Sequence, residues 1–228
     1  MKFNAERIIL FAFLMVLFSF SANAASSKIG ILVFNGVLTS DVTAPIEVFG
    51  AATKKSWFSS YEVVVISAEE GLKIKTEEGL NIVADITIDE KVDLDVLLVP
   101  SSYNMKPLLR NRDLVQYIKS KGRKASWVAS NCSGAFLLAE SGLLNGIKAT
   151  TWFGGEKELK DKYPLVDVQF NSNVVIDKNV ITSNGGAVSY QAALKLLEKL
   201  SSPKFSKEIS EAIQLNRLKQ AAPPNKSN

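Results

Sequence analysis

Residues 125–142 decide the fold of this chain, and they read Ala125-Ser126-Trp127-Val128-Ala129-Ser130-Asn131-Cys132-Ser133-Gly134-Ala135-Phe136-Leu137-Leu138-Ala139-Glu140-Ser141-Gly142. Residues 125–130 are mostly apolar and lack proline, which predicts a buried strand. Residues 135–141 are rich in alanine and leucine, which favours a helix that Gly142 can end. Only a short link separates the two, so the chain must bend sharply and present Cys132, as in a nucleophile elbow.

Cys132 is the only cysteine among the 228 residues. An elbow would place its sulfur at the N-terminus of a helix, where free N–H groups and the helix dipole favour the thiolate. The alternative is a structural cysteine packed in the core, since free cysteines are among the most buried residues. One cysteine cannot form an internal disulfide or a thiolate zinc site.

The chain contains no histidine. This excludes a Ser-His-Asp triad, a Cys-His dyad and any zinc site that needs histidine. We therefore expect no metal and no cofactor. The formal charge of +4 is small and no run of basic residues forms a stripe, so we expect no nucleic-acid partner.

The first 24 residues have the pattern of a secretory signal peptide. Lys2 and Arg7 precede the apolar residues 8–20, and Ala22 and Ala24 provide the small residues that a signal peptidase reads. We expect cleavage after Ala24, export to a periplasm and no membrane contact afterwards. An uncleaved anchor is the alternative, although the apolar run is shorter than the ~20 residues of a spanning helix.

The remaining chain predicts one α/β domain over residues 25–220 and a polar, proline-containing, disordered tail over residues 221–228. Short apolar segments alternate with helical patterns, which predicts a mostly parallel sheet. The expected strands are residues 28–34, 61–68, 94–99, 125–130, 148–153, 166–170, 174–176 and 180–182. The expected helices are residues 108–121, 135–141, 156–162, 187–200 and 203–219, together with one that has Pro45 in its first turn. Residues 72–88 are expected to form a hairpin, and residues 37–44 a loop.

Four polar places follow predicted strands: Asp41, residues 100–102, Cys132 and residues 183–186. The carboxyl ends of parallel strands meet at one edge of a sheet, where ligands bind. We therefore expect these places to converge. The alternative for Asp41 is a loop residue that caps nearby backbone N–H groups.

Four segments, taken in order, resemble the ThiJ/PfpI superfamily of class I glutamine amidotransferase-like domains, with the branch of isonitrile hydratase and of AraC-type regulator sensor domains the most similar. They are Asp41-Val42-Thr43-Ala44-Pro45-Ile46-Glu47-Val48-Phe49, Asp95-Val96-Leu97-Leu98-Val99-Pro100, Cys132-Ser133-Gly134-Ala135-Phe136-Leu137-Leu138-Ala139-Glu140-Ser141-Gly142-Leu143-Leu144 and Ala149-Thr150-Thr151. The resemblance implies a flavodoxin-like sandwich, usually dimeric. It implies that Cys132 is the nucleophile, that Asp41 is the acid beside it, and that Ser133 provides the neighbouring hydroxyl.

The sequence departs from the family pattern at two places. Pro100-Ser101-Ser102 stands where many members have Pro-Gly-Gly, and Trp152 stands where many have histidine. Chemistry that relies on that histidine is therefore not expected. The residues expected to bind substrate or hold an oxyanion are Ser101, Ser102, Gly134, Trp152, Asn184 and Gly185.

Together with the signal sequence, the resemblance implies an exported cysteine-dependent enzyme of the isonitrile-hydratase type that acts on a small electrophile. Asp41 would share a proton with Cys132 and supply it during turnover. Ser133 would position water, unless its hydroxyl only satisfies a backbone donor at the helix start. The alternatives are a catalytically silent ligand-binding or sensor domain, also expected to be a homodimer, and a redox-sensing thiol protein.

Overall fold

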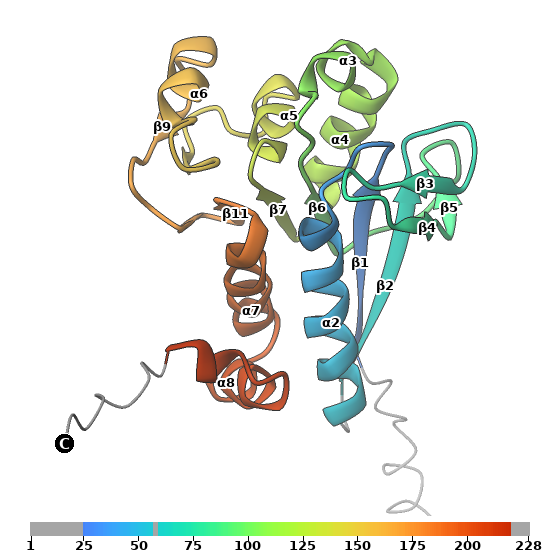
Figure 1. The fold of residues 1–228 in the computed structure, drawn as a ribbon, viewed down its shortest axis with the longest axis vertical. Coiled ribbons are helices and arrows are strands. Elements are labelled where there is room, and N and C mark those ends of the chain that lie inside the picture. Colours follow the sequence, from blue (N-terminus) through green and yellow to red (C-terminus); the bar gives the residue numbers. More distant parts are fainter. Residues whose placement is uncertain (1–24, 57–58, 220–228) are drawn as a thin grey trace, which may run out of the picture.

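The computed structural model describes residues 25–56 and 59–219 (Figure 1). The predicted signal peptide and C-terminal tail lie outside these residues. A seven-stranded sheet with the order β10-β11-β7-β6-β1-β2-β5 forms the centre. Its strands are β1 Ala25–Val33, β2 Ser59–Ser67, β5 Ile86–Thr87, β6 Val96–Val99, β7 Trp127–Asn131, β10 Val174–Asp177 and β11 Val180–Ser183. All neighbouring pairs are parallel except β10 and β11, which confirms the predicted α/β fold.

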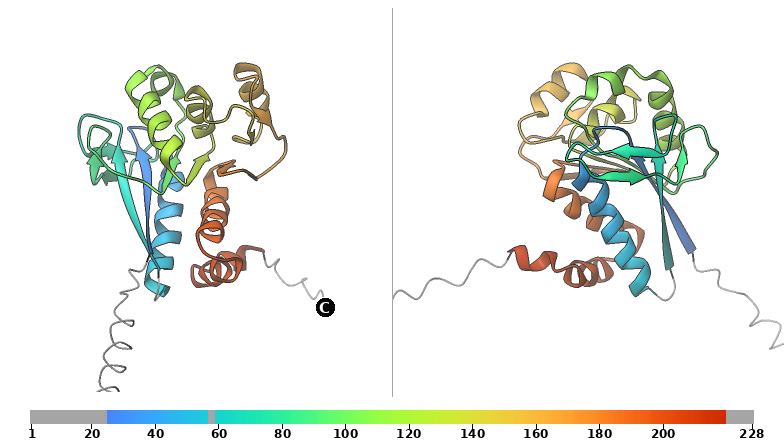
Figure 2. Two further views of the ribbon diagram at one scale, coloured as in Figure 1. Left: turned by 180° about the vertical axis from the view of Figure 1, so that it is seen from behind. Right: turned by 45° about the vertical axis from the view of Figure 1, so that its right-hand side comes forward.

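Helices cover both faces of the sheet (Figures 1 and 2). One face carries α2 (Thr39–Lys55) and α7 (Ser189–Leu200), with α8 (Pro203–Ala212) packed against both. The other face carries α3 (Met105–Arg110), α4 (Arg112–Lys124) and α5 (Gly134–Glu140). The shorter elements are β3 Lys73–Lys75, β4 Asn81–Val83, β8 Lys148–Ala149, α6 Glu156–Lys162, β9 Asp167–Val168, and the 3-10 turns Gly186–Val188 and Leu215–Lys219.

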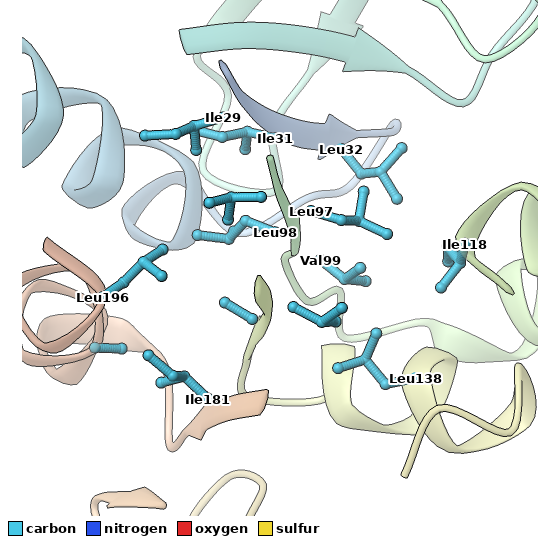
Figure 3. Packing of buried hydrophobic residues seen from close by; sticks show 14 of the residues in the cluster. Ile29, Ile31, Leu32, Leu97, Leu98, Val99, Ile118, Leu138, Ile181 and Leu196 are labelled. Carbon is cyan, nitrogen blue, oxygen red and sulfur yellow. The ribbon is translucent and has the colours of Figure 1, made fainter. Parts of the chain in front are cut away.

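The core lies on both sides of the central strands, which are buried on both faces as parallel strands usually are. Figure 3 shows Leu97 and Val99 of β6 on the side of Ile118 and Leu138, and Leu98 on the side of Leu196. These side chains are fully or almost fully buried. The alternation fixes the register of β6, because a shift by one residue would exchange the two faces.

The predicted hairpin forms between β3 and β4, and the predicted helix 156–162 is α6. The predicted helix 108–121 is wrong in its bounds, because Asn111 separates α3 from α4 and its side chain accepts a bond from Leu114 N (3.0 Å). The strand expected at 148–153 is only β8, and that at 166–170 is only β9. The helix expected at 203–219 ends at Ala212. In the described part of the chain, no helix is long and apolar enough to span a membrane.

The predicted loop 37–44 is wrong, because α2 begins at Thr39 and includes Pro45. A proline inside a helix removes the N–H that would bond the carbonyl four residues earlier, here that of Asp41. The Asn131 side chain donates to this carbonyl instead (3.3 Å). Asn131, at the end of β7, thus stabilises the first turn of α2. Local sequence rules do not take such a distant contact into account.

The hairpin caps α2 from outside. Glu78 accepts bonds from the backbone N and the hydroxyl of Thr39 (2.9 and 2.6 Å), and these bonds lower the pKa of Glu78 from 4.5.

Glu78→Ala is expected to lower the free energy of unfolding by about 0.5 kcal/mol, a small loss because the carboxylate is exposed. A folded pKa below the unfolded one gives stability that is present above pH 4.5 and lost as the pH falls through the folded value. Urea unfolding at pH 7 should therefore separate wild type from Glu78→Ala, and the gap should narrow at pH 3. Glu77→Ala, which removes a neighbouring carboxylate that does not bond α2, should show no such gap.

Candidate active site

Cys132 occupies the sharp bend between β7 and α5. Its φ is 49°, a strained left-handed conformation that non-glycine residues rarely adopt, which confirms the predicted sharp bend. Two hydrogen bonds hold it: Cys132 N donates to the Ser183 carbonyl (2.8 Å), and the Thr151 hydroxyl donates to the Cys132 carbonyl (2.8 Å). The side chain is half-buried, so the sulfur is neither free on the surface nor sealed in the core.

Gly134 lets α5 begin directly against the end of β6. A Cβ at this position would lie 2.3 Å from the Val99 carbonyl oxygen and 2.7 Å from that of Pro100. Gly134 thus has a packing role, and the predicted role in binding an oxyanion stays a prediction. Because backbone atoms cannot yield easily, Gly134→Ala is expected to lower the free energy of unfolding by about 3 kcal/mol.

Gly50→Ala is the matched control for this prediction. Gly50 lies within α2, and a Cβ there meets no atom within 4 Å. Since alanine favours helix over glycine, this variant should be neutral or more stable by up to about 1 kcal/mol. Chemical denaturation of both variants measures the difference, and equal stabilities would contradict the assignment.

Asp41 is fully buried behind the elbow, in the first turn of α2. Its Oδ2 accepts bonds from the Ser101 N and hydroxyl (3.2 and 2.5 Å). Its Oδ1 accepts bonds from Gly186 N (3.1 Å) and from the Ser189 hydroxyl (2.8 Å). The partners are 60 to 148 residues away along the chain, so Asp41 is not the local loop cap of the alternative interpretation.

Burial raises the pKa of Asp41 above its ordinary value, against the lowering effect of these four bonds. Burial also raises the pKa of the Cys132 thiol, and the charge of Asp41 raises it further. The neighbouring Ser101 hydroxyl and the N–H and hydroxyl of Ser133 lower the pKa of the thiol and thus act in the opposite direction. The expectation of a favoured thiolate is therefore wrong, because local helix geometry is outweighed by burial and a neighbouring carboxylate. The carboxyl and the thiol compete for one proton.

Ser101 lies next to both groups, since its hydroxyl donates to Asp41 and also influences the pKa of Cys132. Its N–H is committed to Asp41 and is not a free oxyanion donor. Ser133 is held by Ser102: its hydroxyl donates to the Ser102 carbonyl (2.9 Å) and accepts from Ser102 N (3.3 Å). A water-positioning role for Ser133 thus stays a prediction, and the bonds with Ser102 support its structural alternative.

Gly185 lies between the sulfur-bearing residue and the acid. A Cβ there would lie 2.4 Å from Cys132 Cβ and 3.1 Å from Asp41 Oδ1, and its φ of 77° also favours glycine. The Asn184 side chain donates to the Thr151 carbonyl (2.5 Å) and its N–H donates to the Asn173 carbonyl, so it holds the loop. The predicted binding role of Asn184 therefore gains no support from its contacts.

An open cavity of about 740 Å³ borders Cys132, within the usual range for small-molecule sites. Trp152 lies in its wall and stacks on Phe136, with ring centroids 5.1 Å apart. Ser102 and Ser133 also line it, whereas Asp41 lies behind the wall. The remaining lining residues are Tyr103, Asn104, Met105, Lys106, Leu109, Arg110, Glu158 and Lys162.

Residues 27–199 match the DJ-1/PfpI family. The chain belongs to this family. Among curated relatives, it is 27% identical to the isonitrile hydratase of Pseudomonas putida over 86% of this chain and 80% of that one. It is 28% identical to the HTH-type transcriptional regulator CdhR of Pseudomonas aeruginosa, over 70% of this chain and 46% of the regulator. The crystal structure of a ThiJ/PfpI family protein from Pseudomonas syringae superposes with a TM-score of 0.74 at 22% identity, covering 90% of this chain and 79% of that one.

The site of this DJ-1/PfpI domain also contains residues that sequence reasoning missed. Ser189 completes the bonding of Asp41 together with Gly186 of the predicted segment 183–186, and Thr151 fixes the backbone of Cys132. Thr151 belongs to a segment that resembles the family, but the sequence does not indicate its hydrogen bond to the Cys132 carbonyl. Within residues 25–56 and 59–219, no group of histidine, cysteine or acidic side chains could hold a metal ion.

Proposed function

We propose that this DJ-1/PfpI domain is a cysteine-dependent enzyme that hydrates a small isonitrile or a related electrophile. The observation that carries the proposal is the connected set of Cys132, Ser101 and Asp41 at the wall of an open cavity. The likeness to isonitrile hydratase supports the choice of substrate class. A thiol needs no histidine when another base accepts its proton.

In the first step, the thiol proton passes to Asp41 through the Ser101 hydroxyl, and the sulfur attacks the terminal carbon of R–NC. A carbon–sulfur bond forms. The proton held by Asp41 then returns to that carbon, which leaves the thioimidate R–N=CH–S–Cys132. Burial raises the pKa of Asp41, which favours the protonated carboxyl in this step.

In the second step, water adds to the same carbon, and one of its protons goes to the nitrogen. The carbon–sulfur bond breaks, and the sulfur leaves with the other proton as the restored thiol. The products are the formamide R–NH–CHO and the free enzyme, so the sum is the isonitrile plus one water. Ser133 N–H, which bonds the sulfur, would stabilise the departing thiolate.

The test is to incubate the protein with small isonitriles and to follow the formamide by proton NMR. We expect many product molecules per protein, and an adduct on Cys132 in intact-protein mass spectra at early times. Absence of both product and adduct across isonitriles, aldehydes and amides would refute the enzymatic proposal.

A ligand-binding function is the second candidate. The match to the regulator CdhR favours it, as does Pro100-Ser101-Ser102 in place of Pro-Gly-Gly. In that case, ligands should raise the melting temperature without being consumed.

A further inference from the structure

Helix α3 brings two cations to the cavity beside Cys132. Lys106 and Arg110 are four residues apart, so they lie on the same side of the helix, and both line the cavity. Neither joins any ion pair formed by residues 25–56 and 59–219. Both side chains are exposed and available to a ligand.

The other charges of the cavity do not neutralise them. Glu158 pairs with Lys162 at 2.7 Å, and the Lys162 ammonium also lies 5.6 Å from the centre of the Phe136 ring. The carboxylate of Asp41 is fully buried behind the elbow and does not line the cavity. The charges that line the cavity are therefore three cations and one anion, with two cations unpaired.

Apolar side chains share this cavity with the cations and the sulfur. Met105 and Leu109 belong to α3, and the stacked rings of Phe136 and Trp152 form another part of the wall. A matching ligand has an anionic end, an apolar body and a reactive end.

We propose that Lys106 and Arg110 form an anion subsite, so that the molecule processed at Cys132 is a small carboxylate. Its carboxylate binds the two cations, its body lies against Phe136 and Trp152, and its electrophilic carbon meets the sulfur. A guanidinium suits this role because it binds a carboxylate through two parallel hydrogen bonds. The inference rests on the proposed function only in taking Cys132 as the reacting group.

Iodoacetate and iodoacetamide test the subsite. They are alike in size and differ in charge, and each forms a carbon–sulfur bond with release of iodide. Labelling of the thiol reports on Cys132 alone, since the chain has one cysteine. Lys106→Gln/Arg110→Gln is expected to slow alkylation by iodoacetate about tenfold, because each exposed contact contributes roughly two- to fivefold. The rate with iodoacetamide should stay unchanged.

Lys199→Gln/Lys204→Gln is the matched control. These exposed lysines lie in α7 and α8, at the opposite end of the molecule from α3 (Figure 1), and the net charge changes equally. The control should leave the ratio of the two rates unchanged. An equal ratio in wild type and Lys106→Gln/Arg110→Gln would overturn the subsite, and so would an equal loss with both reagents. Alkylation needs no turnover, so the two proposals can fail separately. If the charge-dependent alkylation is found but no isonitrile is hydrated, the hydratase proposal is refuted and the anion subsite is retained.

Discussion

Cys132→Ser is expected to abolish the hydration of a small isonitrile, with a loss of at least about 1,000-fold. An alcohol is a much poorer nucleophile than a thiol unless a strong base activates it, and the chain has no histidine to do so. Serine fits the same space, and the backbone bonds to Ser183 and Thr151 do not involve the side chain of residue 132. The formamide assay measures the loss, and the melting temperature should stay within a few degrees of wild type.

Cys132→Gly is the structural control for this variant. Glycine adopts a φ of 49° without strain, so it should raise the free energy of unfolding by about 1 kcal/mol while it also removes turnover. Turnover that survives in Cys132→Ser would contradict the role of the sulfur. Stability that falls in Cys132→Gly would contradict the strain.

Asp41→Asn is expected to lower turnover by roughly 100- to 1,000-fold, because the amide cannot take up or return the thiol proton. It should also lower the pKa of Cys132 seen in the pH profile of alkylation, since the carboxylate charge that raises it is gone. Each oxygen of Asp41 accepts a backbone N–H, from Ser101 or from Gly186. The asparagine NH₂ must face one of them, so we expect a loss of about 1 to 3 kcal/mol in the free energy of unfolding.

Ser189→Ala separates the chemical effect of Asp41→Asn from the structural one. It removes one donor to Asp41 Oδ1 but keeps the carboxylate and the Ser101 bridge. We expect it to lower stability by about 1 kcal/mol, to keep the pKa of Cys132 raised and to retain most of the turnover. If Ser189→Ala lost as much turnover as Asp41→Asn, the role of Asp41 would be structural.

The fold could be predicted because its signals are local. The apolar runs of β1, β6 and β7 and the short link before α5 determine strands, helices and the elbow from neighbouring residues. The start of α2 could not be predicted. Pro45 leaves the Asp41 carbonyl without its helical donor, and the Asn131 side chain, 90 residues away along the chain, donates to it instead. Local rules therefore placed the proline in the first turn.

The sequence predicts which residues form the site better than it predicts what each of them does. Cys132, Asp41 and Ser101 converge because they follow parallel strands or lie at the start of a helix beside them. The direction of the thiol pKa was missed, because it depends on burial and on the charge of Asp41, which only the packed structure defines. A role for Lys106 and Arg110 could not be predicted, since nothing in the sequence links the short helix α3 to the cavity beside Cys132.

The bonds of Asp41 also have a consequence for the order of folding. Its carboxylate belongs to the first turn of α2, yet its last donor, Ser189, comes 148 residues later. Contacts of such separation form late, after the entropy of closing a long loop has been overcome. Until α7 docks, the carboxylate must remain hydrated, and the neighbouring thiol lacks the environment that sets its reactivity. The reactive centre is thus completed together with the domain, and no shorter N-terminal portion of the chain that lacks α7 contains it.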